Sequence, residues 1–241
     1  MFKVGSILDS NNSGKFEILE VISSGKVKIR FVGTGYERFA QKHHILKGSV
    51  RDYNRTSYLG VGIADKGVDT KSKVFVAWTS MLTRCYSDNF LKTNPSYKGC
   101  TVSEHFKKFE NFKKWYEFQL LSKDSWCLDK DILIKGNKVY SENTCVFVPM
   151  EINNLILNSG ATRGEFPVGV HYEKSRNKFQ AYIRKNGKRV YLGRYNTVEE
   201  AFYTYKRVKE AYIKEVANKW KDQIDPRVYE ALLNYQVEIT D

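Results

Sequence analysis

Basic and aromatic side chains alternate with aliphatic ones along residues 168–195, where residue type and spacing indicate a binding chemistry most directly. From Lys174 to Arg194 the chain has eight Lys or Arg residues and no Asp or Glu. A sheet face with this charge and no acid to neutralise it favours a polyanion, and the major groove of duplex DNA admits β-strands. The residues expected to contact DNA are Lys174, Arg176, Lys178, Tyr182, Arg184, Lys185, Lys188, Arg189, Tyr191 and Arg194.

These residues must be positioned by three short strands and the helix that follows them. The period-two alternation predicts the strands, and the pattern from Thr197 onward predicts an amphipathic helix to about Val216. Asn196 or Thr197 caps this helix, and Glu199 and Glu200 lie in its first turn, where the helix dipole favours acids. The expected core is Val170, Phe179, Ala181, Ile183, Val190 and Leu192 from the strands, with Ala201, Tyr205 and Val208 from the helix.

The same segment resembles the Apetala2/ethylene-response-factor DNA-binding domain, which is also found appended to phage and bacterial homing endonucleases. The matching elements are Gly169-Val170, Lys178-Phe179, Ala181, Ile183-Arg184, Arg189 to Gly193 and Thr197 to Ala201. That family reads the major groove with its sheet, so the resemblance implies that Arg184, Arg189 and Tyr191 contact DNA. His171-Tyr172-Glu173 departs from the family, whose plant members have an Arg-rich first strand.

The middle of the chain has the order strand, loop, strand, helix. Trp126 to Ile134 and Thr144 to Val148 are predicted to form a hairpin pair, and Glu151 to Leu157 a short helix after Pro149. Two amphipathic helices are predicted before this segment, over residues 74–86 and 106–120.

This segment resembles the ββα-metal nucleases known as HNH endonucleases. The resemblance rests on Leu128 to Asp131, Tyr140 to Cys145 and Pro149 to Asn154, and it extends upstream to Trp78–Tyr86, Tyr97–Cys100 and Asn111–Trp115. It implies a metal-dependent phosphodiester cut that uses Mg²⁺ or Mn²⁺, with no cofactor if the module is inactive. In this interpretation Asp129 holds the metal with Asn154 as second ligand, and Asn143 fixes the loop. Lys130 contacts phosphate, and Asp129, Asp131 and Asn143 are the catalytic candidates.

The general-base histidine of that family is missing. His43, His44, His105 and His171 all lie outside the ββα segment, and a carboxylate is a weak base at neutral pH unless its pKa is raised. Three interpretations stay open: an active nuclease, an inactive ββα fold retained for DNA binding, and ordinary turn acids in an unrelated fold. An inhibitor or interaction protein that uses the same basic surface is a further alternative.

The overall charge agrees with an acidic partner. The formal net charge is +13 and the pI is near 9.4. No apolar run approaches the roughly 20 residues of a spanning helix and no signal peptide is recognised, so we expect no membrane partner and a cytoplasmic location (host cytoplasm if phage-encoded). The four cysteines include no CxxC pair, which favours reduced thiols over a zinc site.

The predicted fold class is α+β, built from small modules. These are an N-terminal β unit over residues 1–55, an HNH-like ββα module with preceding helices over 74–158, a three-stranded antiparallel sheet packed on a helix over 166–220, and a C-terminal helix over 221–241. Residues 51–73 have loop composition. The N-terminal unit, with predicted strands near 16–22, 26–32 and 36–40, is a candidate site for a protein partner.

Overall fold

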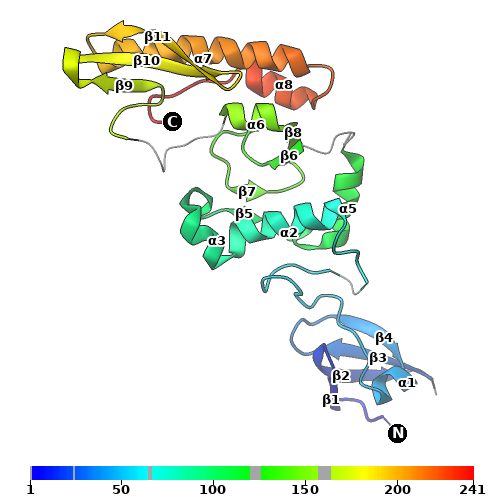
Figure 1. Cartoon of the computed structure of the whole chain (residues 1–241). Helices are drawn as coiled ribbons and strands as arrows, with labels where there is room; N and C mark the ends of the chain where they lie inside the picture. Colours follow the sequence, from blue (N-terminus) through cyan, green and yellow to red (C-terminus); the bar gives the residue numbers. More distant parts are fainter. Residues whose placement is uncertain (1, 24, 65–66, 120–125, 157–163) are drawn as a thin grey trace. The chain divides into compact units, whose positions relative to one another are not determined.

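The computed structural model of the chain describes residues 2–23, 25–64, 67–119, 126–156 and 164–241. Its fold is mixed α+β with small sheets, as predicted (Figure 1). The chain divides into two compact units. The first comprises Met1–Ser87 and Glu104–Lys114, and the second comprises Asp88–Ser103 and Trp115–Asp241.

The N-terminal part of the first unit is a four-stranded antiparallel sheet in the order β1-β2-β3-β4. Its strands are β1 (Ile7–Ser10), β2 (Gly14–Val21), β3 (Lys26–Phe31) and β4 (Glu37–Gln41), and α1 (Lys42–Leu46) follows. The sequence predicts the last three strands but not β1, whose side chains are exposed or half-buried and give a weak alternation signal. The core of the sheet includes Phe16, Ile18, Val27, Ile29 and Phe31.

The rest of the first unit packs around α2 (Lys73–Tyr86), which Ser72 caps by accepting a hydrogen bond from the Phe75 amide. The helix predicted over 106–120 is instead two helices, α4 (Glu104–Lys107) and α5 (Phe109–Phe118), and Leu120 lies outside the described residues. The break arises because Ile63 forms hydrogen bonds with backbone groups between the two helices. Ile63 N donates to Lys107 O, and Phe109 N donates to Ile63 O. A contact more than 40 positions away along the chain therefore overrides the helical pattern.

The second unit begins with α3 (Asp88–Thr93), the 3-10 turn η1 (Pro95–Tyr97) and β5 (Thr101–Val102), which pairs in parallel with β7 (Val139–Tyr140). The hairpin pair is formed by β6 (Trp126–Asp129) and β8 (Val146–Pro149), and α6 (Met150–Ile156) follows. The strand predicted to reach Ile134 stops at Asp129. Its carboxylate accepts hydrogen bonds from the amides of Asp131 and Ile132, which turns the chain.

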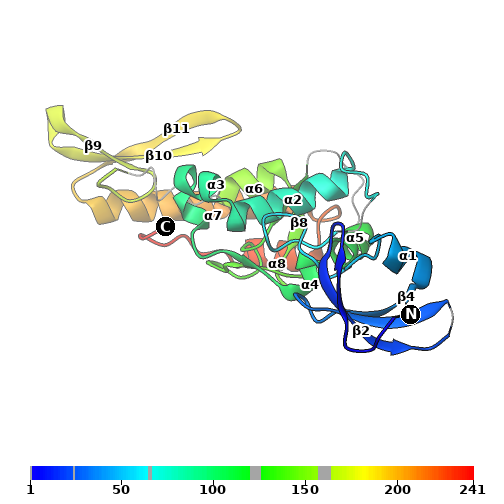
Figure 2. The same ribbon diagram turned by 90° about the horizontal axis from the view of Figure 1, so that it is seen from below.

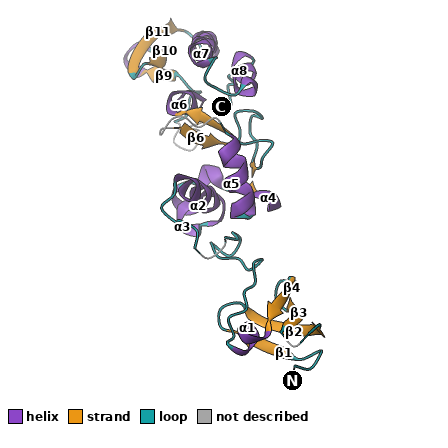
Figure 3. Ribbon diagram, turned by 90° about the vertical axis from the view of Figure 1, so that its right-hand side faces the viewer, coloured by secondary structure: helices purple, strands orange, loops and turns teal. Residues whose placement is uncertain are grey.

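The C-terminal sheet has the order β11-β10-β9, with both pairs antiparallel. Its strands are β9 (Val170–Glu173), β10 (Lys178–Lys185) and β11 (Lys188–Tyr195), with the 3-10 turn η3 (Lys174–Arg176) between the first two. The helices α7 (Val198–Trp220) and α8 (Pro226–Leu233) follow. Figures 1 and 3 show α7 along one side of the sheet, so one sheet face is left uncovered by this helix. Thr197 and Glu200 form a capping box at the start of α7, which confirms one of the two predicted caps.

One hydrophobic core joins the C-terminal sheet and its helices to the ββα segment. Val170, Ala181 and Ile183 from the sheet are buried in the same cluster as Val146 and Ile152 from β8 and α6. At the far end of α7, Lys219 and Trp220 both donate to the Glu151 carboxylate. The ββα segment and the C-terminal sheet are therefore held together by apolar packing as well as by chain connection.

Val190 was predicted in this core, but it is 39% exposed. Its strand, β11, is an edge strand, and α7 contacts β10 more than β11. The pairing of the two strands also shifts register between Ala181 and Tyr182. The alternation therefore identified the correct face for Val190, but it could not indicate how far the helix covers that face.

Candidate nucleic-acid interface

The register of the C-terminal sheet sorts its residues onto two faces. Phe179, Ala181 and Ile183 pack toward α7, so the residues between them point to the opposite side. Cross-strand partners share a face, and the pairs Tyr182–Tyr191, Arg184–Arg189, Gln180–His171 and Lys178–Glu173 extend it over all three strands. We call this side the outer face, and its residues are His171, Glu173, Lys178, Gln180, Tyr182, Arg184, Arg189, Tyr191 and Arg194.

A tight turn holds β10 and β11 in this register. Asn186 and Gly187 both have positive φ, 49° and 75°, which is the conformation of a two-residue type I′ hairpin. The Asn186 amide and side chain also bind the Tyr212 hydroxyl of α7, at 3.2 and 3.1 Å. The turn is therefore fixed both by its own residues and by the helix.

Tyr182 lies at the centre of an aromatic and cationic cluster on the outer face. Its ring centre is 5.3 Å from that of Tyr191 and 5.7 Å from that of His171. The Arg189 guanidinium carbon lies 3.8 Å from the centre of the Tyr182 ring, a cation–π contact. Burial, and then the charge of Arg189, lower the pKa of His171 below its ordinary value, so its imidazole is neutral at neutral pH.

Glu173 supplies an acid that the basic sequence run did not reveal. Its Oε2 accepts hydrogen bonds from Arg194 Nε at 2.7 Å and from Gln180 Nε2 at 2.6 Å. Arg176 Nε lies 3.7 Å from its Oε1. The expectation that no acid neutralises the face is therefore wrong: Glu173 lies one position before the run, and strand pairing brings it across the sheet to Arg194.

The predicted DNA-contacting residues fall into three groups. Lys178, Tyr182, Arg184, Arg189, Tyr191 and Arg194 lie on the outer face, and Lys174 and Arg176 lie in η3 at its edge. Lys185 and Lys188 are opposite each other on the helix side. There Lys185 Nζ binds Glu215 of α7 at 2.9 Å and lies 4.6 Å from the centre of the Tyr212 ring. The structure thus does not place Lys185 or Lys188 with the other eight.

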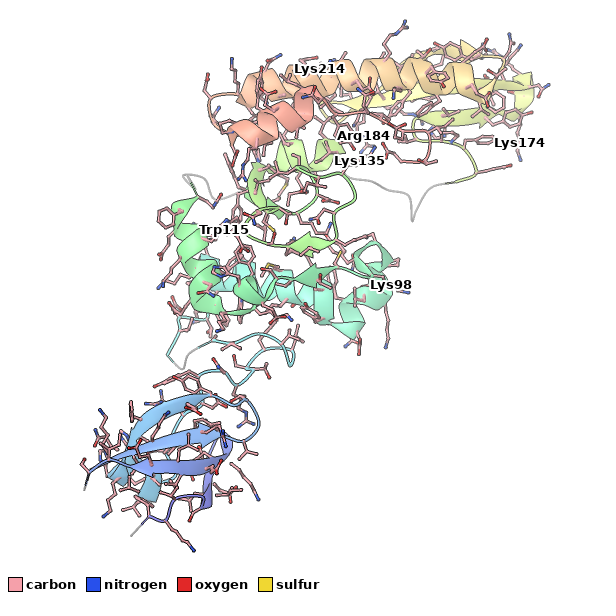
Figure 4. All side chains as sticks on the ribbon, turned by 180° about the vertical axis from the view of Figure 1, so that it is seen from behind. Lys98, Trp115, Lys135, Lys174, Arg184 and Lys214 are labelled. Atoms are coloured by element: carbon pink, nitrogen blue, oxygen red, sulfur yellow. The ribbon has the colours of Figure 1, made fainter. Side chains whose placement is uncertain are left out.

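The cations of the outer face differ in how firmly they are held. Among the described residues, Arg184 takes part in no ion pair, hydrogen bond or cation–π contact, and its side chain is exposed. Lys178 binds Asn196 through its ammonium group. Figure 4 labels Lys174 and Arg184, which lie toward opposite ends of the sheet. The face therefore combines two guanidinium groups with defined contacts, those of Arg189 and Arg194, with Arg184, which has none among the described residues.

In the ββα segment, the carboxyl group of Asp129 is already engaged by its own backbone. Its Oδ1 accepts the Asp131 and Ile132 amides at 2.8 and 2.7 Å. Burial, and then the charge of Asp131, raise the pKa of Asp129 above its ordinary value of 3.8, although these two hydrogen bonds act in the opposite direction. Asp129 is consequently both a turn-forming residue and a carboxyl group with a perturbed pKa.

Lys130 does not have the position expected of a phosphate contact. It is 7% exposed, and its ammonium group pairs with Asp131 at 3.1 Å. The same nitrogen lies 5.9 Å from the centre of the Tyr97 ring and 5.8 Å from that of Tyr140. Lys130 therefore points into the protein, and its predicted role is corrected to a structural one.

Two further predicted residues of this segment, Asn143 and Asn154, lie at the surface. Asn143 is exposed in the turn before β8, and Asn154 is exposed on α6. Across the part of the chain that the structure describes, no group of three or more His, Cys, Asp and Glu side chains could hold a metal ion. Burial, the largest cause, raises the pKa of Cys145 to about 12, so its thiol is not a nucleophile at neutral pH.

Sequence reasoning missed two residues that organise the outer face, Gln180 and Glu173. Both could have been found by extending the strand alternation to polar residues, because Gln180 is two positions before Tyr182 on the same strand. Comparisons of the chain with models of known protein families, with curated proteins and with solved structures find no match. None of the helices in the described part of the chain is long and apolar enough to cross a membrane.

Proposed function

We propose that this protein binds double-stranded DNA in a sequence-dependent way through the outer face of β9, β10 and β11. The observation that carries this proposal is the gathering of Arg184, Arg189 and Arg194 with Tyr182 and Tyr191 on one face of two paired strands. Only one carboxylate, that of Glu173, lies among them on this face. The remaining positive charge favours a polyanion, and a two-stranded ribbon fits the major groove.

The residues of the face suit different parts of a DNA duplex. Guanidinium groups at the centre of the face suit the acceptor edges of bases, and the rings of Tyr182 and Tyr191 suit thymine methyls and sugars. Lys174 and Lys178, near the β9–β10 turn, suit backbone phosphates. On this proposal phosphates supply most of the affinity and the centre of the face supplies the preference for sequence.

The test is a fluorescence anisotropy titration of a labelled random-sequence duplex with the full chain, repeated over about 50 to 200 mM salt. We expect binding that weakens steeply as salt rises, because bound cations release counterions from the duplex. The double variant Arg189→Ala with Arg194→Ala should bind the duplex more weakly than the wild type at every salt concentration. Wild-type protein that binds no duplex at the lowest salt, or binds without salt dependence, would rule out the proposal.

A second candidate function is a metal-dependent phosphodiester cut of the homing-endonuclease type, and the raised pKa of Asp129 favours it. A carboxyl group whose pKa lies closer to neutrality is a better general base than an ordinary aspartate. With Asp129 as the base, Mg²⁺ or Mn²⁺ would have to be held largely by substrate phosphate and water, with Asn154 as the protein ligand, because a carboxylate that binds the metal directly has its pKa lowered. Asp131 and Asn143, the other catalytic candidates, lie between Asp129 and Asn154 in the sequence.

Cleavage of supercoiled plasmid with Mg²⁺ or Mn²⁺ tests this second candidate. The informative variant is Asp129→Asn, because an amide oxygen can still accept the two backbone hydrogen bonds of the turn while the base is lost. Nicking by the wild type that disappears in Asp129→Asn would support the nuclease. DNA binding without any cutting by the wild type would instead support a DNA-binding regulator.

A further inference from the structure

Glu173 joins three separate segments of the outer face. It lies at the end of β9, opposite Lys178 of β10, and its side chain is 20% exposed. Its carboxylate contacts Arg194 of β11, Gln180 of β10 and Arg176 of η3. The two hydrogen bonds to Oε2, from Arg194 and Gln180, are both shorter than 2.8 Å, whereas Arg176 is held only by a longer ion pair.

The contacts of Glu173 continue to the guanidinium group of Arg189. Gln180, held through its amide nitrogen by Glu173, accepts a hydrogen bond from the Tyr182 hydroxyl at 2.8 Å through its amide oxygen. The ring of Tyr182 in turn carries the Arg189 guanidinium 3.8 Å from its centre. A single chain of contacts thus leads from Glu173 to Arg194 on one side and to Arg189 on the other.

We propose that Glu173 is a positioning residue that sets the DNA sequence selectivity of the outer face, an inference that rests on the proposed function. Glu173 binds the Nε side of Arg194, which leaves the other side of the guanidinium for the acceptor edge of a base. A guanidinium that is already oriented loses less side-chain entropy when it makes such a contact.

The negative charge of Glu173 acts against unselective binding as well. It offsets part of the positive charge of Arg194 and Arg176, so phosphate attraction at this part of the face is weaker. Phosphate attraction is the same for every sequence, whereas contacts to bases are not. Weaker phosphate attraction together with better-oriented base contacts raises the ratio of specific to unspecific affinity.

The test compares Glu173→Gln with Glu215→Gln in the full chain. Both substitutions remove one carboxylate that accepts a short hydrogen bond from a cation, but Glu215 binds Lys185 on the helix side. A duplex is first selected with wild-type protein from a randomised library. The dissociation constants for the selected duplex and a scrambled duplex of equal composition are then measured over a salt series, and thermal unfolding reports on the fold.

The selectivity ratio is the affinity for the selected duplex divided by the affinity for the scrambled duplex. For Glu173→Gln we expect this ratio to fall about tenfold, mainly because the scrambled duplex binds more tightly. The salt slope, which is the slope of log affinity against log salt concentration, should steepen by about one. Glu215→Gln should leave the ratio within about twofold of the wild type, although the net charge changes equally. Arg194→Lys gives an independent check, because it keeps the charge but loses the planar fork that Glu173 orients. Its selectivity ratio should fall while its salt slope stays the same.

A selectivity ratio that is unchanged in Glu173→Gln and in Arg194→Lys would overturn the role of Glu173 and leave the proposed function standing. An equal loss of selectivity in Glu215→Gln would also overturn it, since the effect would then follow net charge alone. If Glu173→Gln unfolds, the selectivity ratio of Arg194→Lys decides: a lowered ratio supports the role of Glu173, and an unchanged ratio overturns it. Wild-type protein that retains no duplex would overturn both this inference and the proposed function.

Discussion

The N-terminal and C-terminal antiparallel sheets each contain a strongly basic strand, but they use the cations differently. On the N-terminal sheet, Lys28 of β3 pairs with Glu37 at 2.9 Å, and Arg30 pairs with Glu17 at 2.7 Å. On the C-terminal sheet one carboxylate serves several guanidinium groups, and Arg184 has no partner among the described residues. The four N-terminal strands contain five Lys or Arg and four Asp or Glu residues, whereas the three C-terminal strands contain six and one, so more positive charge is left on the C-terminal sheet.

This difference gives the N-terminal sheet a different expected role. Exposed surface ion pairs contribute little to stability, and their charges cancel at a distance. We therefore expect no important DNA contact from this sheet, and a protein partner for it stays a prediction. Exposed apolar side chains such as Phe39 and Ile7 lie on the same unit, and Figure 2 shows these strands from a second direction.

The largest expected effect on stability comes from replacing a glycine beside the C-terminal sheet, compared with the same replacement of a glycine in the N-terminal sheet. Gly169, with φ of +79°, lies so close to Tyr205 that an added Cβ would be 2.2 Å from that ring. Gly169→Ala should lower the free energy of unfolding by about 2–4 kcal/mol, because strain and overpacking act together. Gly14, at φ of +77°, has nothing within 4 Å, so Gly14→Ala should cost only about 1 kcal/mol. Urea unfolding of both variants measures the difference, and equal losses would contradict the packing described.

Removing two cations should lower duplex affinity when they come from the C-terminal sheet but not when they come from the N-terminal sheet. Arg189→Ala with Arg194→Ala should weaken duplex binding by about 2–3 kcal/mol, since each guanidinium is oriented on the outer face. Lys28→Ala with Arg30→Ala removes the same number of charges from the N-terminal sheet, and duplex affinity should change by less than about twofold. Titrations at one salt concentration suffice. A similar loss in both double variants would mean that total charge, rather than arrangement, determines the affinity.

Unlike the carboxylates of the two sheets, Asp129 accepts hydrogen bonds from backbone amides rather than from a cation. Asp129→Ala loses two hydrogen bonds of the turn and should lower the free energy of unfolding by about 1–2 kcal/mol. Asp129→Asn can keep them. Because the pKa of Asp129 is raised in the folded state, the folded protein binds this proton more tightly than the unfolded chain, and stability from this group is lost as pH rises above 3.8.

It follows that Asp129→Asn should be at least as stable as the wild type near pH 7, and that this advantage should disappear below pH 3.8. Urea unfolding at neutral and acid pH measures both variants. An Asp129→Asn protein as unstable as Asp129→Ala at neutral pH would show that the charge itself holds the turn.

The smallest expected effect separates neighbouring residues on the two faces of β10. Lys185→Ala should change duplex affinity by less than about twofold, because Lys185 binds Glu215 on the helix side. Arg184→Ala should weaken binding several-fold and reduce the preference for sequence, because a guanidinium can reach base edges. Competition between selected and scrambled duplexes measures both. Equal effects would contradict the assignment of faces.

The C-terminal sheet could be predicted from sequence because local signals agreed there. Alternation and the Thr197 cap each depend on residues close together in the chain. Long-range contacts explain the failures. The break between α4 and α5 depends on Ile63, and the pairing of β5 with β7 involves only two residues in each strand. The side of Lys185 follows from alternation, because Lys185 is two positions after Ile183, but its ion pair with Glu215 depends on the length of α7.

The predicted nuclease residues show a second limit of sequence reasoning. Residue types at Asp129, Lys130 and Asp131 agreed with a catalytic turn, but the structure uses the first for backbone hydrogen bonds and buries the second. Carboxylates in tight turns commonly bind nearby amides, so their presence in a loop is weak evidence for catalysis. Strand register, in contrast, follows from a pattern of many residues.

The proposal that the outer face binds DNA is tested most directly by charge reversal at two exposed cations of the second unit, Arg184 on the outer face and Lys214 on α7, both labelled in Figure 4. Arg184→Glu and Lys214→Glu change the net charge equally, and their duplex affinities are measured beside the wild type at low salt. We expect Arg184→Glu to weaken duplex binding by at least about tenfold and Lys214→Glu to change it by no more than about threefold. Equal losses, or a larger loss for Lys214→Glu, would contradict the outer face as the DNA-binding surface.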